Sequence, residues 1–177
     1  MVTEKEKALE LGAKKVVAID PDPTQVECLR RNFREEIAAG RVVIVPKGVW
    51  SGTGTMALSV GESHSGVSSL VEDAGQETIE VAVTTIDLLM EELGLPRVDY
   101  ITLDIEGAER EALRGATLTL AKHQPRLFID AYHREDDMEL LPKVILGANP
   151  HYKMTCGPCE IAGYSPPRII PHYMFYG

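Results

Sequence analysis

Residues 16–45 read VVAIDPDPTQVECLRRNFREEIAAGRVVIV, and this stretch decides the fold class. The apolar runs at residues 16–20 and 42–45 are short and continuous, as buried strands are. Between them, Asp22 is expected to cap a helix with its apolar residues on one face, and Gly40 is expected to end it. Alternating strand, helix and strand predict a parallel sheet with crossover helices, which is an α/β fold.

The alternation continues on both sides of this stretch. A helix is expected to open the chain and to end at Gly12. Thr84 and Asp87 form a capping-box pattern before another helix, and residues 52–54 are expected to form a hairpin turn. Further strands are predicted at residues 56–60, 79–83, 98–105 and 126–131, with two short strands after Tyr152 around the loop Ser165-Pro166-Pro167.

Size and charge exclude several classes of protein. The chain has 177 residues and is interpreted as a single domain over residues 1–177. Its 18 Lys and Arg against 27 Asp and Glu give a net charge of −9, which argues against nucleic acid or an anionic membrane as the main partner. Because no apolar run is long enough for a bilayer and the first residues do not resemble a signal peptide, a cytoplasmic protein is expected.

The three cysteines, an odd number, do not form a disulfide framework. Cys28 lies on the helix after residue 22 and is predicted to be buried. Cys156-Gly157-Pro158-Cys159 has the C-x-x-C spacing, but its late position argues against a redox role. We interpret this pair as a tight turn with free thiols rather than as half of a zinc site with His151 or His172, so no metal site is expected.

Three predicted strands end in a carboxylate, at Asp20, Asp104 and Asp130. Ligands of open α/β sheets bind beyond these carboxyl ends, where an acid after the second strand often accepts hydrogen bonds from ribose hydroxyls. Asp20 is therefore either a ribose ligand or a cap for the turn that follows it. His133 follows the third of these acids and is either a general base, since imidazole titrates near neutral pH, or an exposed loop residue.

Several blocks carry a family resemblance. VVAIDPDP at residues 16–23, GVWS at 48–51, VTTID at 83–87 and especially VDYITLDIEGAE at 98–109 resemble, in this order, the conserved segments of FkbM-type methyltransferases, which use S-adenosylmethionine. Residues 29–32, 113–116 and 124–125 agree in register. The resemblance covers about residues 12–133, and a match over this many ordered blocks is more specific than a match to one motif.

The resemblance implies a three-layer, Rossmann-like class I methyltransferase sheet with strand order 3-2-1-4-5-7-6. It implies that Asp20 and Pro21 hold the cofactor ribose and that Gly48, Val49 and Trp50 lie near the adenine. Asp104 would lie under the transferring methyl group, and Glu106 would line the same cleft. Glu109 is either another residue of this cleft or an acid that favours the start of a helix. In two departures from the family pattern, Asp20 replaces a glutamate and Thr102 replaces a lysine.

The first strand and its glycine-rich loop are not found in the sequence. The loop is expected about 20 residues before the ribose acid, at or before Met1. Because that strand is central, its absence predicts a gap in the sheet whose backbone groups need partners. Three outcomes remain open: the flanking strands pair directly, a partner chain fills the gap, or the gene starts upstream.

The sequence therefore leaves competing functions. The first is a methyltransferase with S-adenosylmethionine as cofactor and an oxygen of a small molecule or sugar as acceptor. The second is a non-catalytic module that keeps the methyltransferase fold. A third is a thiol or zinc protein built on Cys156 and Cys159. A homodimer, formed through the open strand edges, is expected in the first two cases.

Overall fold

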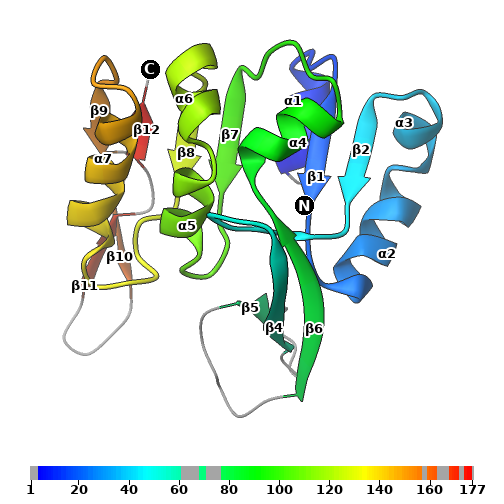
Figure 1. Cartoon of the computed structure of the whole chain (residues 1–177), viewed down its shortest axis with the longest axis horizontal. Helices are drawn as coiled ribbons and strands as arrows, with labels where there is room; N and C mark the ends of the chain where they lie inside the picture. The colour runs from blue at the N-terminus through cyan, green and yellow to red at the C-terminus, as the bar shows by residue number, and fades with distance from the viewer. Residues whose placement is uncertain are drawn as a thin grey trace.

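Strands and helices alternate along most of the chain, as the sequence predicts (Figure 1). The computed structural model describes residues 4–60, 68–70, 77–156, 159–162, 168–171 and 174–176. In chain order the elements are α1 (Glu4–Glu10), β1 (Val16–Ile19), α2 (Pro23–Asn32), α3 (Arg34–Ala38), β2 (Val42–Val45), β3 (Gly48–Val49), β4 (Gly54–Val60), β5 (Ser68–Ser69), β6 (Glu77–Thr84), α4 (Ile86–Glu92), β7 (Tyr100–Leu103), α5 (Glu109–Arg114), α6 (Thr117–His123), β8 (Arg126–Ile129), α7 (Asp137–Ala148), β9 (Met154–Cys156), β10 (Cys159–Ala162), β11 (Arg168–Pro171) and β12 (Met174–Tyr176).

The described strands form small separate sheets rather than one complete sheet. β1 and β2 are a parallel pair, and β7 and β8 are a second parallel pair that β12 and β9 extend in antiparallel fashion. β3, β6, β4 and β5 form a third sheet, and β10 and β11 form a hairpin. Among the described strands β1 pairs only with β2, so the structure contradicts direct pairing of β1 with β7 across the predicted gap.

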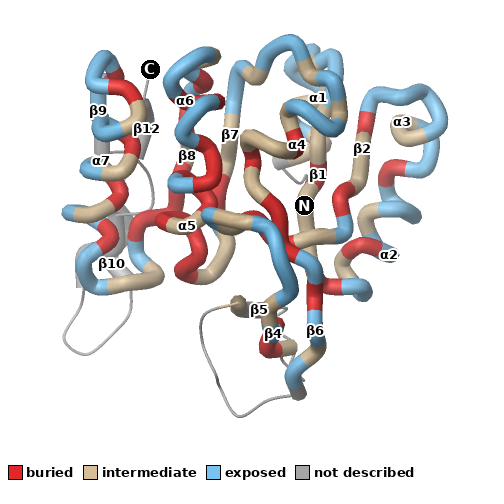
Figure 2. Tube along the Cα trace, viewed as in Figure 1, coloured by how far each residue is buried: buried red, intermediate tan, exposed pale blue. Residues whose placement is uncertain are grey.

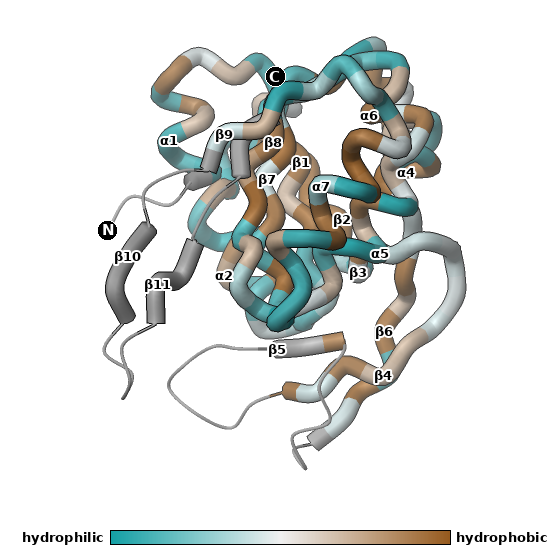
Figure 3. The backbone as a smooth tube through the Cα atoms, turned by 90° about the vertical axis from the view of Figure 1, so that its left-hand side faces the viewer, coloured by the Kyte–Doolittle hydropathy of each residue, from teal (hydrophilic) through white to brown (hydrophobic). Residues whose placement is uncertain are grey.

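The strands nevertheless share one direction and one layer. β1, β2, β7 and β8 point the same way in Figure 1, so their carboxyl ends meet at one edge of the molecule. In Figure 3 these strands lie in the middle, with α1 on one side and α4, α6 and α7 on the other. This is the layered α/β arrangement that the sequence predicts. Within the described residues, however, the strands do not form one complete sheet.

The main core lies between β7–β8 and the helices α5, α6 and α7 (Figure 2). Burying a leucine or isoleucine side chain fully is worth about 1.5–3 kcal/mol, so this half of the molecule holds much of the folding free energy. The fully buried aliphatic side chains here are Leu113, Leu120, Leu127, Ile129, Leu141 and Ile145. This core fixes the position of the loops that follow β7 and β8.

Two expectations about helices are wrong. The helix predicted up to Gly40 breaks at Phe33, whose φ of −105° and ψ of 26° separate α2 from α3. Because the Phe33 side chain is only 3% exposed, packing of its ring overrides the helical pattern. Cys28, predicted to be buried, is exposed on α2.

The cap of α4 is Thr85, not Thr84 as predicted. Thr85 has the extended backbone that an N-cap requires, and its Oγ1 accepts from the N–H of Leu88 at 3.0 Å. Thr84 is the last residue of β6. The Asp87 carboxylate instead accepts from the N–H groups of Leu118 and Thr119 at 3.0 and 2.7 Å, and so caps the start of α6.

The remaining differences concern strands and turns. Four strands, β9 to β12, follow Tyr152 instead of the predicted two, and the loop 165–167 lies outside the described residues. Gly52 to Gly54 do not join a hairpin, because β3 and β4 both border β6, one parallel and one antiparallel. Helix α7 is an element that the sequence pattern does not reveal, since Pro142 lies inside it. In the described part of the chain, no helix has the length and apolarity needed to cross a membrane.

Candidate functional site

The loops after β7 and β8 lie side by side. The two strands are parallel neighbours, with Leu103 opposite Ile129, so Asp104 and Asp130 both follow at the same edge of the sheet. The side chain of Asp104 is 59% exposed, whereas Asp130 is buried. This edge is where ligands of open α/β sheets bind.

The chain turns sharply after β7. Glu106 and Gly107 both have positive φ angles, of 53° and 92°. A non-glycine residue in this region is strained and is often found at functional sites. The turn leads into α5, whose first residue, Glu109, is fully buried and accepts from the N–H of Ile105 at 2.9 Å. The two ends of the turn are therefore tied together, and the Glu106 carboxylate lies 3.4 Å from His133, in the loop after β8.

Arg134 ties the loop after β8 to this turn. Its Nε donates to the carbonyl of Gly107 at 2.9 Å, and its backbone N–H donates to Asp137 Oδ2 at 2.7 Å. A Cβ on Gly107 would lie 3.4 Å from Arg134 Nε, which shows how closely the two loops pack. His133 is consequently drawn inward, and its side chain is only 8% exposed. The alternative of an exposed loop histidine is wrong.

The imidazole of His133 faces three carboxylates. Its Nε2 lies 3.5 Å from Asp104 Oδ1 and 3.4 Å from Glu106 Oε2, and its Nδ1 lies 3.0 Å from Glu109 Oε1. These contacts are not aligned as hydrogen bonds: within the described part of the chain, both ring nitrogens and Glu109 Oε2 are buried without a hydrogen-bond partner. We call Asp104, Glu106 and His133, with Glu109 behind them, the acidic cluster.

The charges of the acidic cluster shift its pKa values. Burial alone would lower the pKa of His133, but the Glu109 carboxylate and the charges of Glu106 and Asp104 outweigh it and raise that pKa. Burial would likewise raise the pKa of Glu109, but the His133 imidazole and the N–H of Ile105 outweigh it and lower that pKa. The cluster therefore favours a positive charge at its centre, surrounded by ionised carboxylates.

Asp20 lies at the same edge but in the other parallel pair. Its Oδ1 accepts from the N–H of Asp22 at 3.0 Å, and Asp22 in turn accepts from Thr24 and caps α2. Burial is the main cause that raises the pKa of Asp20, and the nearby charge of Asp22 adds to it. Of the two predicted roles, the turn cap is present, yet it uses only one carboxylate oxygen. Within the described residues, the hydrogen bond found for the Asp20 side chain is the one at Oδ1.

The segment predicted to lie near the adenine is held from two sides. Gly48 and Val49 are buried in β3, and the N–H of Trp50 donates to the carbonyl of Thr84 at 2.8 Å. A Cβ placed on Gly115, at the end of α5, would lie 2.1 Å from the Trp50 carbonyl oxygen. Only glycine allows this approach, and it connects Trp50 to the helix that begins at the acidic cluster.

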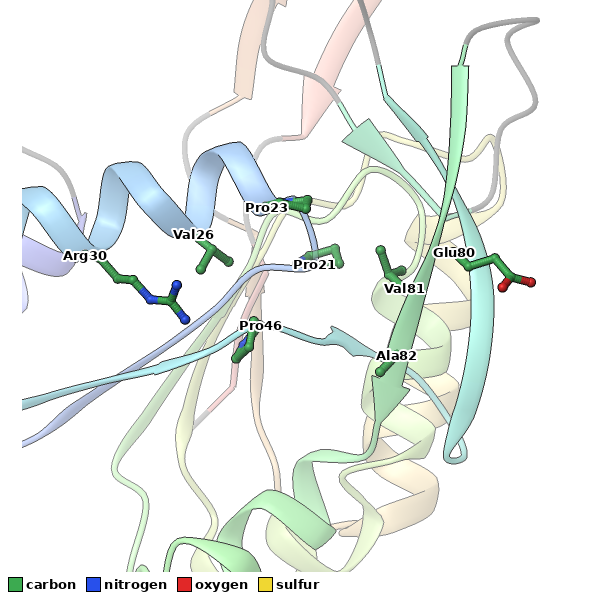
Figure 4. Close-up of a pocket in the computed structure, with 8 residues that line it drawn as sticks. All are labelled: Pro21, Pro23, Val26, Arg30, Pro46, Glu80, Val81 and Ala82. Atoms are coloured by element: carbon green, nitrogen blue, oxygen red, sulfur yellow. The ribbon is translucent and has the colours of Figure 1, made fainter.

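A shallow depression of 310 Å³ lies beside the loop that follows Asp20 (Figure 4). It shares no residue with the acidic cluster. Its lining is mostly apolar and comes from the start of α2, the end of β2 and the middle of β6. The lining residues are Pro21, Pro23, Val26, Arg30, Pro46, Glu80, Val81 and Ala82.

The structure places the predicted site residues in three groups, one of which is Gly48, Val49 and Trp50 at β3. Asp104, Glu106 and His133 come together, whereas Asp20 belongs with Pro21 and the β1–β2 pair. Sequence reasoning left the role of Glu109 open, and its full burial against His133 now places it in the cluster. It missed Arg134 entirely, because the partner of Arg134 is a backbone carbonyl that no sequence pattern marks. The side chains of Cys156 and Cys159, and His172, lie outside the described residues.

Comparisons with known proteins bear on the family and the fold. The family model described as the methyltransferase FkbM domain matches residues 2–152. A crystal structure of methyltransferase FkbM from Methylobacillus flagellatus KT is similar to the chain, with a TM-score of 0.63 and 23% sequence identity. The similarity covers 93% of this chain and 36% of that protein, so the chain spans little more than a third of its length. At this identity the likeness shows the fold alone. No curated protein sequence matches the chain.

Proposed function

The chain belongs to the methyltransferase FkbM domain family, and on that premise we propose that it transfers a methyl group from S-adenosylmethionine to a hydroxyl oxygen of a small molecule or sugar. The observation that carries the proposal is the buried His133 imidazole facing Asp104 and Glu106 at the carboxyl ends of β7 and β8. A hydroxyl acceptor must be oriented and must lose its proton as its oxygen is methylated, and this cluster supplies the groups for both tasks.

The residues around Asp20 fit the cofactor. Asp20 is a half-buried acid with one oxygen engaged in the turn, and its carboxylate suits the hydroxyls of a ribose. We assign Asp20 and Pro21 to the ribose, and Gly48, Val49 and Trp50 to the neighbourhood of the adenine. When bound, S-adenosylmethionine supplies an electrophilic methyl group on a positively charged sulfur.

The acidic cluster acts at the acceptor. Glu109 is held by the N–H of Ile105 and lies 3.0 Å from Nδ1 of His133, while Nε2 faces Asp104 and Glu106. The negative charge of these carboxylates favours the positively charged methyl donor. The groups of the acidic cluster can also take up the proton that the acceptor hydroxyl releases. Because Arg134 holds the two loops together, these groups are in place before an acceptor arrives.

Calorimetric titration with S-adenosylmethionine and S-adenosylhomocysteine tests the cofactor site. We expect binding by the wild-type chain and a loss of about tenfold or more in affinity for Asp20→Asn, because a charged hydrogen-bond acceptor is lost. Glu27→Gln, which neutralises an exposed carboxylate on α2, is the matched control and should leave the affinity unchanged. If the wild-type chain shows no binding up to about 1 mM, the alternative of a methyltransferase-fold module without activity is favoured.

The acceptor side needs a separate test. With methyl-labelled S-adenosylmethionine and a panel of hydroxyl-bearing sugars and small molecules, His133→Gln should abolish transfer while cofactor affinity stays within about threefold. Equal transfer by the wild type and His133→Gln would remove the cluster from the mechanism. We also propose the homodimer expected from the sequence, because β1 and β7 do not pair with each other among the described strands. Light scattering after gel filtration checks this.

A further inference from the structure

Three potential metal ligands converge at the acidic cluster. One carboxylate oxygen from Asp104, one from Glu106 and one imidazole nitrogen from His133 all lie within 4.8 Å of one another. They come from two loops that the Arg134–Gly107 hydrogen bond holds together, so the convergence is built into the fold.

The buried imidazole is a second and independent sign of a ligand. The His133 side chain is more than nine-tenths buried, and its Nε2 has no hydrogen-bond partner within the described residues. A buried polar atom without a partner is costly, and such an atom in a native structure calls for an explanation such as an ion. Nε2 is also the nitrogen that faces both Asp104 and Glu106.

The charge of the site points the same way. Asp104, Glu106 and the fully buried Glu109 surround one imidazole, and three carboxylates so close together repel one another unless a cation lies among them. A divalent cation among these carboxylates would balance their charge.

Glu109 occupies the position of a supporting residue. Metal-binding histidines usually donate their other ring N–H to a carboxylate, which fixes the tautomer and orients the ring. Glu109 Oε1 lies 3.0 Å from His133 Nδ1 and is itself held by the N–H of Ile105, so this carboxylate is within reach of the other ring nitrogen. If Nδ1 carries the proton that faces Glu109, Nε2 is the nitrogen that can bind a cation.

We propose that the chain binds one divalent transition-metal cation, such as Mn²⁺ or Zn²⁺, through Asp104, Glu106 and Nε2 of His133, with Glu109 as the carboxylate that orients the imidazole. The separations of 3.4 and 3.5 Å between Nε2 and the two carboxylates suit adjacent ligands of an ion bound at about 2.0–2.2 Å. An imidazole beside two carboxylates favours such ions over Mg²⁺ or Ca²⁺, which prefer oxygen ligands. Only three protein ligands converge among the described residues, so coordination positions remain for water or an acceptor oxygen.

The role of this cation rests on the proposed function, whereas its binding does not. In methyl transfer, the cation would hold the acceptor oxygen and lower the pKa of its hydroxyl, so that the O–H bond breaks more easily and the proton leaves to solvent. His133 would then be a metal ligand rather than the general base that the sequence suggests.

The binding is tested with Mn²⁺ alone, in the absence of cofactor. The metal-free full chain is titrated with Mn²⁺, and the free ion is followed by electron paramagnetic resonance. We expect one ion per chain and a loss of at least about tenfold in affinity for Asp104→Asn and for His133→Gln. Glu139→Gln, which neutralises an exposed carboxylate on α7, is the control and should bind Mn²⁺ like the wild type.

A spectroscopic readout separates the built site from scattered surface carboxylates. The wild-type Mn²⁺ complex should show the electron spin echo modulation of a coordinated imidazole nitrogen, and His133→Gln should lose it while retaining its circular dichroism spectrum. Absence of this modulation in the wild type, or unchanged affinity in Asp104→Asn, would overturn the proposal. Because Asp104 is exposed, that variant is expected to fold. Failure of cofactor binding in calorimetry would refute the proposed function and leave this result intact.

Discussion

Replacing Gly115 by alanine tests how tightly the end of α5 is packed against Trp50. The added Cβ would lie 2.1 Å from the Trp50 carbonyl oxygen and 3.2 Å from Thr85 Cβ. The first distance is about 1 Å shorter than any ordinary contact, and the atom it meets belongs to the backbone, which cannot rotate away as a side chain can.

The magnitude follows from what must move. The Trp50 backbone is fixed by its hydrogen bond to Thr84, and the Gly115 carbonyl accepts from the N–H of Asp87 at 2.9 Å. Overpacking costs about 1–3 kcal/mol, and the rigid surroundings place Gly115→Ala near the upper end. For a domain of this size, about 3 kcal/mol lowers the melting temperature by about 6–12 °C.

Thermal and urea unfolding followed by circular dichroism measure the effect. Gly147→Ala is the matched control, because Gly147 lies in α7 with no atom within 4 Å of its added Cβ, and alanine there should stabilise the chain by about 0.5 kcal/mol. If Gly115→Ala unfolds within about 0.5 kcal/mol of the wild type, the close approach of α5 to Trp50 is wrong. Cofactor affinity should fall together with stability, since Trp50 has to move.

Three further predictions follow from single contacts. Arg110→Met should destabilise the chain by about 3 kcal/mol in urea unfolding, because the fully buried Asp137 loses its charged partner. In an Asp137→Asn background, the same substitution should cost much less. Asp87→Ala should cost about 1 kcal/mol, because two N–H groups at the start of α6 lose their acceptor, and a loss of zero in the same assay would contradict the cap. The raised pKa of Asp20 means that this carboxylate takes up a proton at a higher pH than an ordinary aspartate does. As the pH is lowered in steps, calorimetry should therefore show the cofactor affinity of the wild type falling at a higher pH than an ordinary aspartate would cause, and a flatter profile for Asp20→Asn.

The sequence predicts local features of this molecule well. The apolar runs at β1, β2 and β8 and the cap at Asp22 are decided by neighbouring residues, and the structure confirms them. The family blocks likewise mark Asp104 and Glu106 because these residues follow a strand directly. Such signals are short-range, so a single sequence contains them in full.

The sequence fails where contacts join distant segments. The burial of His133 depends on Arg134 reaching the carbonyl of Gly107, which lies 27 positions earlier, and the choice of Thr85 over Thr84 as a cap depends on where β6 ends. The break at Phe33 has the same origin, since packing decided it. Each of these features is set by contacts between segments far apart in the sequence, and neither residue propensity nor motif spacing contains information about such contacts.

The acidic cluster and Asp20 stand on different pairs of strands. The acidic cluster stands on β7 and β8, which pair directly and are covered by the core of α5, α6 and α7. Asp20 stands on the β1–β2 pair, which is a separate sheet in the described residues. We therefore expect Asp20→Asn to leave Mn²⁺ affinity within about twofold of the wild type, because sites without shared partners behave additively. Mn²⁺ titration of both proteins measures this, with Glu109→Gln as the comparison that should weaken binding about 10–100-fold. A large loss in Asp20→Asn would mean that the two strand pairs act as one unit despite the gap between them.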